Sequence, residues 1–271
     1  MKILITGHKG FIGSNLIPLL GDYTVRGWDL VQDHDIFDDD FSKQVKWADV
    51  VIHLVALTNV TGSFNNQEEH FRINTLGTAR VLELCLKYKK RLIYPSTGAI
   101  HIPNTSPYAL TKMYAELLVQ KASEFIPITI LRFFNIYGKG KHANFNSILF
   151  QFLEGARKGK IEVYGAGKGK RDFINVTDIV QVIKASLSKE WIGEIVEVGS
   201  GKLTSIKELA KIFGKETVTP VEFDNTKKEI AWITPDLTNL KRLYKKKLKT
   251  DVKKDVKEII NGWDIKQFLN L

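Results

Sequence analysis

The amino-terminal segment constrains the fold more than any other part of the chain. A short apolar run, KILIT, is followed at once by the glycine-rich GHKGFIG. The apolar FIGSNLIPLL then predicts a helix of about ten residues that Pro18 disturbs. Gly7, Gly10 and Gly13 allow a tight turn and let backbone amides at the helix start approach a pyrophosphate. Three glycines alone are a weak signal, because ordinary turns contain them too.

An acidic residue after the next predicted strand strengthens this interpretation. The stretch YTVRGWDL contains Asp29, which lies 22 residues after Gly7. A carboxylate there accepts hydrogen bonds from both ribose hydroxyls of NAD and repels the extra phosphate of NADP. No arginine immediately follows Asp29, which again favours NAD. Strand, glycine loop, helix, strand and acid together predict an NAD site.

Further strands alternate with helices along the chain. DVVIHLVAL (residues 49–57), RLIYPST and PITILRFFNIYG are near-continuous apolar runs, typical of parallel strands covered on both faces. They predict an α/β fold with a doubly wound (Rossmann) parallel sheet. Its ligand should lie at the carboxyl ends of the strands, where Gly7, Ala56, Thr97 and Asn135 fall.

The texture of the sequence changes after about residue 138, to loops, short helices and a basic carboxyl terminus. We expect residues 1–138 to form the dinucleotide-binding domain, with residues 172–200 returning to it. Residues 139–271 should form mainly a smaller substrate-binding lobe.

A tyrosine and a lysine lie four residues apart in SPYALTKMYAE. The same spacing occurs twice more, but those pairs enclose glycines and are typical of loops: Tyr137/Lys141 and Tyr164/Lys168. Only Tyr108 and Lys112 lie on a predicted helix, with Ser106 as N-cap and Pro107 at the first helical position. Both side chains therefore share one face and can reach one point.

Composition and charge narrow the class of protein. The net charge is +10, and nine basic residues lie between Lys241 and Lys257. They are interleaved with apolar residues, which favours a solvated face over a nucleic-acid surface. The single cysteine, Cys85, predicts a reduced thiol in a cytoplasmic protein. No apolar run is long enough to span a membrane, and the six histidines lack metal-ligand spacing, so we expect neither feature.

A series of motifs follows the order found in a known family. They are TGHKGFIG, WDL, DIFD, HLVAL, INTLGT, YPSTGAI, SPYALTK, LRFFNIYG, VYGAGKGKRDFINVTD and VEVGSG. Across nearly its whole length the chain resembles the extended short-chain dehydrogenase/reductases of the NAD-dependent epimerase/dehydratase family, whose best-known type is UDP-glucose 4-epimerase. The motifs are highly specific for the family and much less so for the substrate.

The resemblance implies a role for each motif residue. It assigns to NAD the residues Gly7, Gly10, Phe11, Ile12, Gly13, Asp29, Asp35, Ile36, Leu54 and Ala56, and to the nicotinamide neighbourhood Asn74. Its catalytic set is Thr97, Tyr108 and Lys112, of which the last two also contact the cofactor. It places Asn135 and Arg171 at the diphosphate of a nucleotide sugar.

The chemistry requires these residue types. Oxidising a sugar hydroxyl needs a base, and a lysine ammonium and the positive nicotinamide should lower the pKa of Tyr108. Bland alternatives are that Thr97 caps the following segment, that Asn135 serves a turn, and that Arg171 pairs with Asp172 at the surface.

Departures from the family pattern narrow the reaction. Dehydratases of the family carry an Asp-Glu pair directly after the threonine, and decarboxylases carry a nearby glutamate. This chain has Gly98 and Ala99 there. The cysteine and histidine of GDP-fucose synthase-like enzymes are not found. Epimerisation of a nucleotide sugar therefore remains, with a reductase of a keto-sugar nucleotide or a non-catalytic NAD- or nucleic-acid-binding protein as alternatives.

Two further expectations follow from the resemblance. The family implies a homodimer packed through helices around residues 76–90 and 108–125, with Met113, Leu117 and Leu118 at helical spacing, although these side chains could instead face the sheet. His101 stands where the family usually has tyrosine, and the sequence offers no reason for the change.

Overall fold

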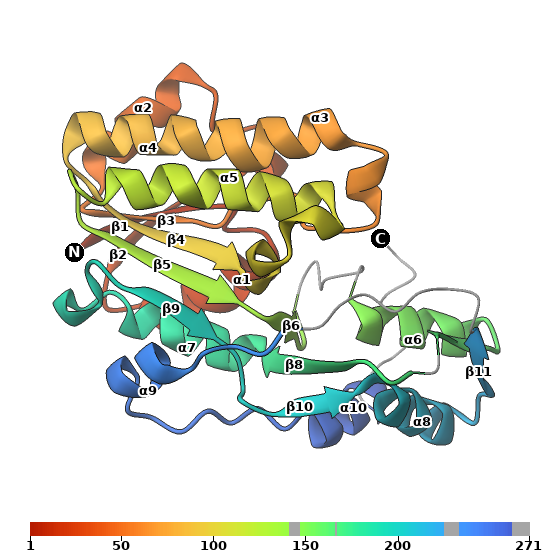
Figure 1. Cartoon of the computed structure of the whole chain (residues 1–271). Coiled ribbons are helices and arrows are strands. Elements are labelled where there is room, and N and C mark those ends of the chain that lie inside the picture. Colours follow the sequence, from red (N-terminus) through yellow and green to blue (C-terminus); the bar gives the residue numbers. More distant parts are fainter. Residues whose placement is uncertain (141–146, 166, 225–232, 262–271) are drawn as a thin grey trace.

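The computed structural model describes residues 1–140, 147–165, 167–224 and 233–261 of the 271-residue chain. In these ranges six parallel strands form the main sheet, in the order β2-β1-β3-β4-β5-β9 (Figure 1). Their bounds are β1 Lys2–Thr6, β2 Thr24–Trp28, β3 Val50–His53, β4 Arg91–Thr97, β5 Ile128–Phe133 and β9 Ile195–Val198. The strand order reverses between β1 and β3, which confirms the doubly wound α/β fold.

Helices cover both faces of this sheet (Figure 1). One face carries α2 (Asp39–Trp47), α4 (Gly77–Tyr88) and α5 (Pro107–Ala122). The other face carries α1 (Phe11–Leu16) and α7 (Val176–Ala185). The result is a three-layer arrangement in which every central strand is buried on both sides, as the apolar runs predict.

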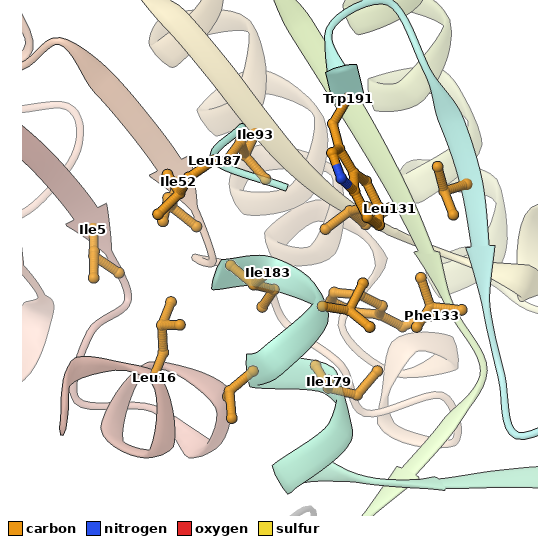
Figure 2. Packing of buried hydrophobic residues seen from close by; sticks show 14 of the residues in the cluster. Ile5, Leu16, Ile52, Ile93, Leu131, Phe133, Ile179, Ile183, Leu187 and Trp191 are labelled. Atoms are coloured by element: carbon orange, nitrogen blue, oxygen red, sulfur yellow. The ribbon is translucent and has the colours of Figure 1, made fainter. Parts of the chain in front are cut away.

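Side chains that alternate along each strand of the main sheet fill two hydrophobic cores, one on each face of the sheet. Ile5 of β1 packs toward Leu16 of α1 and Ile183 of α7, as Figure 2 shows, while its neighbour Leu4 packs against the α2 and α4 side. Successive side chains of a strand point to opposite faces, so one run fills both layers. Burial of each such side chain stabilises the fold by about 1.5–3 kcal/mol.

The smaller lobe is built on two short sheets and a third core. Strand β8 (Lys170–Asn175) pairs in parallel with β6 (Asn135–Tyr137) and antiparallel with β10 (Leu203–Ser205). Strand β7 (Ile161–Tyr164) pairs with β11 (Val221–Asp224). The helices α6 (Ile148–Arg157), α8 (Ile206–Thr217) and α10 (Val252–Asn261) pack around them. The other α-helices in the described residues are α3 (Gln67–His70) and α9 (Thr238–Leu243), and a π-helical stretch, Phe71–Leu76, leads from α3 into α4.

Two predicted strands are shorter than their apolar runs. In DVVIHLVAL the strand ends at His53, because its neighbour β1 ends at Thr6, the partner of His53, and Gly7 then turns away. In PITILRFFNIYG, β5 ends at Phe133 beside Val198, the last residue of β9. Residues 135–137 then pair with β8 in the other sheet, so one run serves two sheets.

The first helix behaves as Pro18 predicts. The α-helix ends at Leu16 and continues as a 3₁₀ turn over Ile17–Leu20. Proline has no amide hydrogen, so it cannot continue the α-helical ladder, but it fits the first turn of a new helical segment.

Candidate active site

A cleft of about 680 Å³ lies at the carboxyl ends of the main strands and extends to the smaller lobe. It brings together most of the residues selected from the sequence: Gly7, Gly10, Phe11, Ile12, Gly13, Leu54, Ala56, Thr97, Tyr108, Lys112, Asn135 and Arg171. Asp29, Asp35, Ile36 and Asn74 do not belong to its lining. The predicted position of the ligand at the strand ends therefore coincides with a cavity that can hold one.

The glycine loop forms one wall of the cleft. Gly7 has a φ angle of +69°, which favours glycine, and its amide donates to the carbonyl of Trp28. A Cβ on Gly13 would lie 2.6 Å from the carbonyl oxygen of Gly7, so the helix can pack this closely on the loop only without a side chain. This bare backbone at the start of α1 fits a dinucleotide pyrophosphate.

Asp29 lies directly after β2 and beside this loop. One carboxylate oxygen accepts the amide of Lys9 at 2.8 Å and the other accepts the amide of Val31 at 3.1 Å. The side chain is therefore held in place between the glycine loop and the end of β2.

Asp35 and Ile36 lie between β2 and α2, outside the lining of the cleft. The Asp35 carboxylate accepts the amide of Phe37 at 3.1 Å, and Ile36 is buried against Gly77 at the start of α4. In the protein alone both residues therefore serve packing and a local turn.

Asn74 does not line the cleft but holds a segment of backbone that does. Its side-chain oxygen accepts the amide of Leu57 at 2.8 Å, and its side-chain nitrogen donates to the carbonyl of the same residue at 3.0 Å. The nitrogen also donates to the Thr111 hydroxyl at 3.3 Å. Asn74 thus fixes the backbone that follows β3, including Ala56 in the lining.

Strand β4 and helix α5 bring the predicted catalytic residues together. Thr97 is the last residue of β4, Tyr108 lies on the first turn of α5, and both residues line the cleft. Thr97 also caps the following turn by accepting the amide of Ala99 at 3.2 Å. Lys112, one turn after Tyr108, is buried and its ammonium donates to the carbonyl of Pro95 at 2.9 Å. Thr97 therefore caps the following segment, and it also lies in the cleft with Tyr108.

The start of α5 is organised as the sequence predicts. The Ser106 hydroxyl accepts the amide of Ala109 at 3.1 Å, and Pro107 occupies the first helical position. The amide of Tyr108 donates to the Ser63 hydroxyl at 3.2 Å. Ser63 comes from a stretch with no recognisable signal, so this support was not predicted.

Burial dominates the pKa values of both Tyr108 and Lys112. Burial raises the pKa of Tyr108, and the hydrogen bond from Thr97 only partly opposes this. Burial also lowers the pKa of Lys112 to about 7, against the attraction of Glu116. Without the nicotinamide, removal of the phenolate from water therefore outweighs the hydrogen bond from Thr97, and the expected lowering by Lys112 and NAD together stays a prediction.

Asn135 and Arg171 lie on the side of the cleft nearest the smaller lobe. The Asn135 amide nitrogen donates to the carbonyl of Asp172 at 2.8 Å and joins β6 to β8. The Asp172 side chain is fully buried and accepts hydrogen bonds from Ser200 and Gly201. A surface pair of Arg171 with Asp172 is therefore not what holds this strand.

Two contacts near Thr97 were not predicted. A Cβ on Gly98 would lie 2.6 Å from the Phe134 ring, so glycine is needed there for steric reasons. His101 has its Nε2 atom 2.5 Å from a carboxylate oxygen of Glu197 on β9. This contact ties the short turn after β4 to the edge strand β9.

Within the described residues no helix is both long and apolar enough to cross a membrane. The same part of the chain contains no group of three His, Cys, Asp or Glu side chains that could hold a metal ion.

Comparison with known proteins identifies the class. The model of the NAD dependent epimerase/dehydratase family matches residues 3–199, and the chain belongs to this family. It is therefore an enzyme of a family that acts with NAD, and NAD is its cofactor.

Individual relatives cover most of the chain. A UDP-N-acetyl-alpha-D-glucosaminuronate decarboxylase of Bacillus cytotoxicus is 30% identical, over 89% of this chain and 91% of the relative. A putative UDP-glucose 4-epimerase of Methanocaldococcus jannaschii is 29% identical, over 96% and 97%. A solved UDP-glucuronic acid 4-epimerase of Bacillus cereus, bound to UDP-glucuronic acid and NAD, has a TM-score of 0.86 at 25% identity, covering 97% of this chain and 99% of its own.

Proposed function

We propose that this chain is an NAD-dependent nucleotide-sugar epimerase. The observation that carries the proposal is the meeting of Thr97, Tyr108 and Lys112 in the cleft beside the glycine loop. Such a site can take the proton from a sugar hydroxyl and return a proton to the same oxygen; the configuration would invert when the hydride is returned to the opposite face of the keto-sugar. Residues 1–138 with 172–200 would hold the cofactor, and residues 139–271 mainly the nucleotide sugar.

In this mechanism Tyr108 is the base. It accepts the proton of the reacting hydroxyl, while Thr97 orients that hydroxyl and relays the proton. Bound NAD would supply a hydride acceptor and donor for the sugar carbon, and a positive ring that favours the phenolate of Tyr108. Lys112 holds the nicotinamide ribose and stabilises the phenolate. Asn135 and Arg171 bind the diphosphate, which keeps the nucleotide in place while the keto-sugar turns.

The turn after Thr97 favours epimerisation over the other reactions of the family. Elimination and decarboxylation need an acidic group there, by resemblance to the enzymes that perform them. Positions 98 and 99 carry no acid, and the Phe134 ring occupies the space that a side chain at position 98 would need. For the same reason we do not assign decarboxylation to this chain, although the decarboxylase of Bacillus cytotoxicus is 30% identical to it.

A product assay without added cofactor tests the proposal. The purified enzyme is incubated with UDP-, dTDP- and GDP-sugars, and products are separated by chromatography and weighed by mass spectrometry. An epimerase yields a product of unchanged mass, whereas loss of water or carbon dioxide identifies a dehydratase or a decarboxylase. Denatured protein should also release stoichiometric NAD. Turnover that requires added reduced cofactor, with no NAD released, would instead support the keto-sugar reductase.

The proposed enzyme is a homodimer. Leu117 and Leu118 on α5 are 53% and 45% exposed, so they do not face the sheet. Tyr114 on the same helix is exposed as well. An apolar strip of this kind on a helix favours contact with a second copy of the chain.

A further inference from the structure

A third residue of α5, Glu116, contacts the end of β4 beside the proposed catalytic set. Lys112 donates to the carbonyl of Pro95, and the hydroxyl of the next residue, Ser96, donates to a carboxylate oxygen of Glu116 at 2.5 Å. Tyr108, Lys112 and Glu116 follow one another at intervals of four residues. Residues at this spacing lie on one face of a helix, so Glu116 extends the tyrosine–lysine pair by one turn.

Glu116 is buried inside a row of alternating charges. Its side chain is 1% exposed. One oxygen accepts hydrogen bonds from Arg132 of β5, with Nη2 at 2.7 Å and Nε at 3.0 Å, and another from Gln120 at 2.8 Å. Arg132 in turn lies 3.4 Å from the carboxylate of Glu197 on β9. The charges along this row are positive on Lys112, negative on Glu116, positive on Arg132 and negative on Glu197.

The other groups around Lys112 do not supply a negative charge. From β4, the Tyr94 ring lies 4.3 Å from the Lys112 ammonium, and the pKa of its phenol is raised by burial. From β3, His53 is buried, and burial together with Lys112 lowers its pKa to about 3, so the ring is neutral. On α5 itself, burial raises the pKa of Tyr108. Glu116, buried one turn further along the same face of α5, is thus the acidic side chain among these neighbours, and its attraction opposes the effect of burial on the pKa of Lys112.

We infer that Glu116 is a positioning residue that keeps Lys112 in its ammonium form at the end of β4. The inference rests on the role proposed for Lys112, through which Glu116 acts without touching substrate. If Glu116 is made neutral, the buried cations Lys112 and Arg132 face Glu197 alone. A buried excess of positive charge is relieved most easily when Lys112 loses its proton.

Direct titration of Lys112 tests this inference without any assay of turnover. The enzyme is labelled with ¹³C-lysine, and the Lys112 signal is identified by its absence from Lys112→Met. Glu116→Gln should lower the pH midpoint of Lys112 by about one to three units, the range expected for loss of a close opposite charge. An unchanged midpoint in folded Glu116→Gln overturns the inference, whether or not the enzyme proves to be an epimerase.

Two matched variants separate charge from packing. Ser96→Ala removes a hydrogen bond to Glu116 but no charge, so the Lys112 midpoint should stay near the wild-type value. Glu124→Gln repeats the substitution at an exposed glutamate paired with Lys121 and should also leave it unchanged. If Glu116→Gln does not fold, Glu116→Asp is titrated in its place. This variant keeps the negative charge, so the titration midpoint of Lys112 should stay near the wild-type value. A large fall in the Asp variant contradicts the inference.

Turnover gives a second measurement where the enzyme is active. Lys112 must carry its proton, so activity falls as the pH rises through the pKa of Lys112. In Glu116→Gln this alkaline decline should begin at lower pH. A purely structural role would reduce activity equally at every pH.

Discussion

At the scale of single residues, Tyr108 has an environment that opposes its proposed task. Burial favours the neutral phenol, and Thr97 supplies one hydrogen bond in the other direction. In the proposed mechanism a phenolate at this position needs positive charge beside it, and Lys112 is the protein group proposed to supply it. Substitutions of Tyr108 and of Lys112 should therefore have different effects on turnover and on its pH dependence.

Tyr108→Phe should bind NAD normally and lose most turnover, because the ring remains and only the proton acceptor is removed. A base in its proper geometry contributes about 10²–10⁴-fold, so the loss should lie in or above that range. Lys112→Met should weaken NAD binding and move the activity profile to higher pH, since the phenolate becomes harder to form. The measurement is turnover against pH. Near-normal turnover of Tyr108→Phe on the best substrate would show that SPYALTK is not the active site.

Asp29 should select NAD over NADP. Its carboxylate is held by the amides of Lys9 and Val31, so it cannot easily swing away from a 2′-phosphate. Titration of the apo protein with both dinucleotides should give tighter binding of NAD, and Asp29→Asn should narrow the difference. Asp22→Asn, an exposed aspartate near Lys184, is the matched control and should leave the preference intact. Equal or tighter binding of NADP by the wild type would contradict the assignment.

At the scale of elements, the start of α5 sets the position of Tyr108, the proposed base. Ser106 caps the helix from a buried position, and Tyr108 lies on its first turn. A change in the cap should therefore affect both stability and activity.

Ser106→Ala should lower the free energy of unfolding by about 0.5–2 kcal/mol, the usual contribution of an N-cap. It should also reduce turnover, because the first turn of α5 loses its anchor. Ser123→Ala, at the exposed end of the same helix, should change neither property appreciably. Denaturant unfolding and steady-state kinetics provide the two measurements. Unaltered turnover in a destabilised Ser106→Ala variant would show that the cap does not position Tyr108.

At the scale of the whole molecule, the basic carboxyl-terminal segment covers both parts of the molecule: Tyr244 and Leu248 pack on a core of the main sheet, and Val252 and Val256 on the core of the smaller lobe. Lys253 pairs with Glu208 and Lys257 with Glu216, both acids of α8. Arg242 pairs with Glu194 before β9. These contacts support the interpretation of the segment as a solvated face over that of a nucleic-acid surface.

The proposed dimer can be tested on the exposed strip of α5. The wild type should have the mass of a dimer by light scattering at micromolar concentration. The double substitution Leu117→Glu and Leu118→Glu should give monomers, because charges cannot be buried unpaired in an apolar contact. Leu203→Glu, on β10 of the smaller lobe, is the control and should remain dimeric. A monomeric wild type would refute the proposal.

Local features of this protein could be predicted because their causes are close together in the sequence. The turn at Gly7, the acid after β2, the cap at Ser106 and the effect of Pro18 each depend on residues within the same segment. The parallel sheet could also be predicted, since double burial leaves continuous apolar runs.

Only the tertiary structure decided where those runs end and which charges meet. Strand β3 stops where β1 stops, and β5 stops beside the end of β9, so each boundary depends on a neighbour distant in sequence. Glu116 lies on α5, but the arginine that binds it comes from β5. The pKa of Tyr108 likewise depends on how much water the packed elements exclude. Hydrogen-bond partners and desolvation belong to the assembled layers, and no single segment of the sequence contains them.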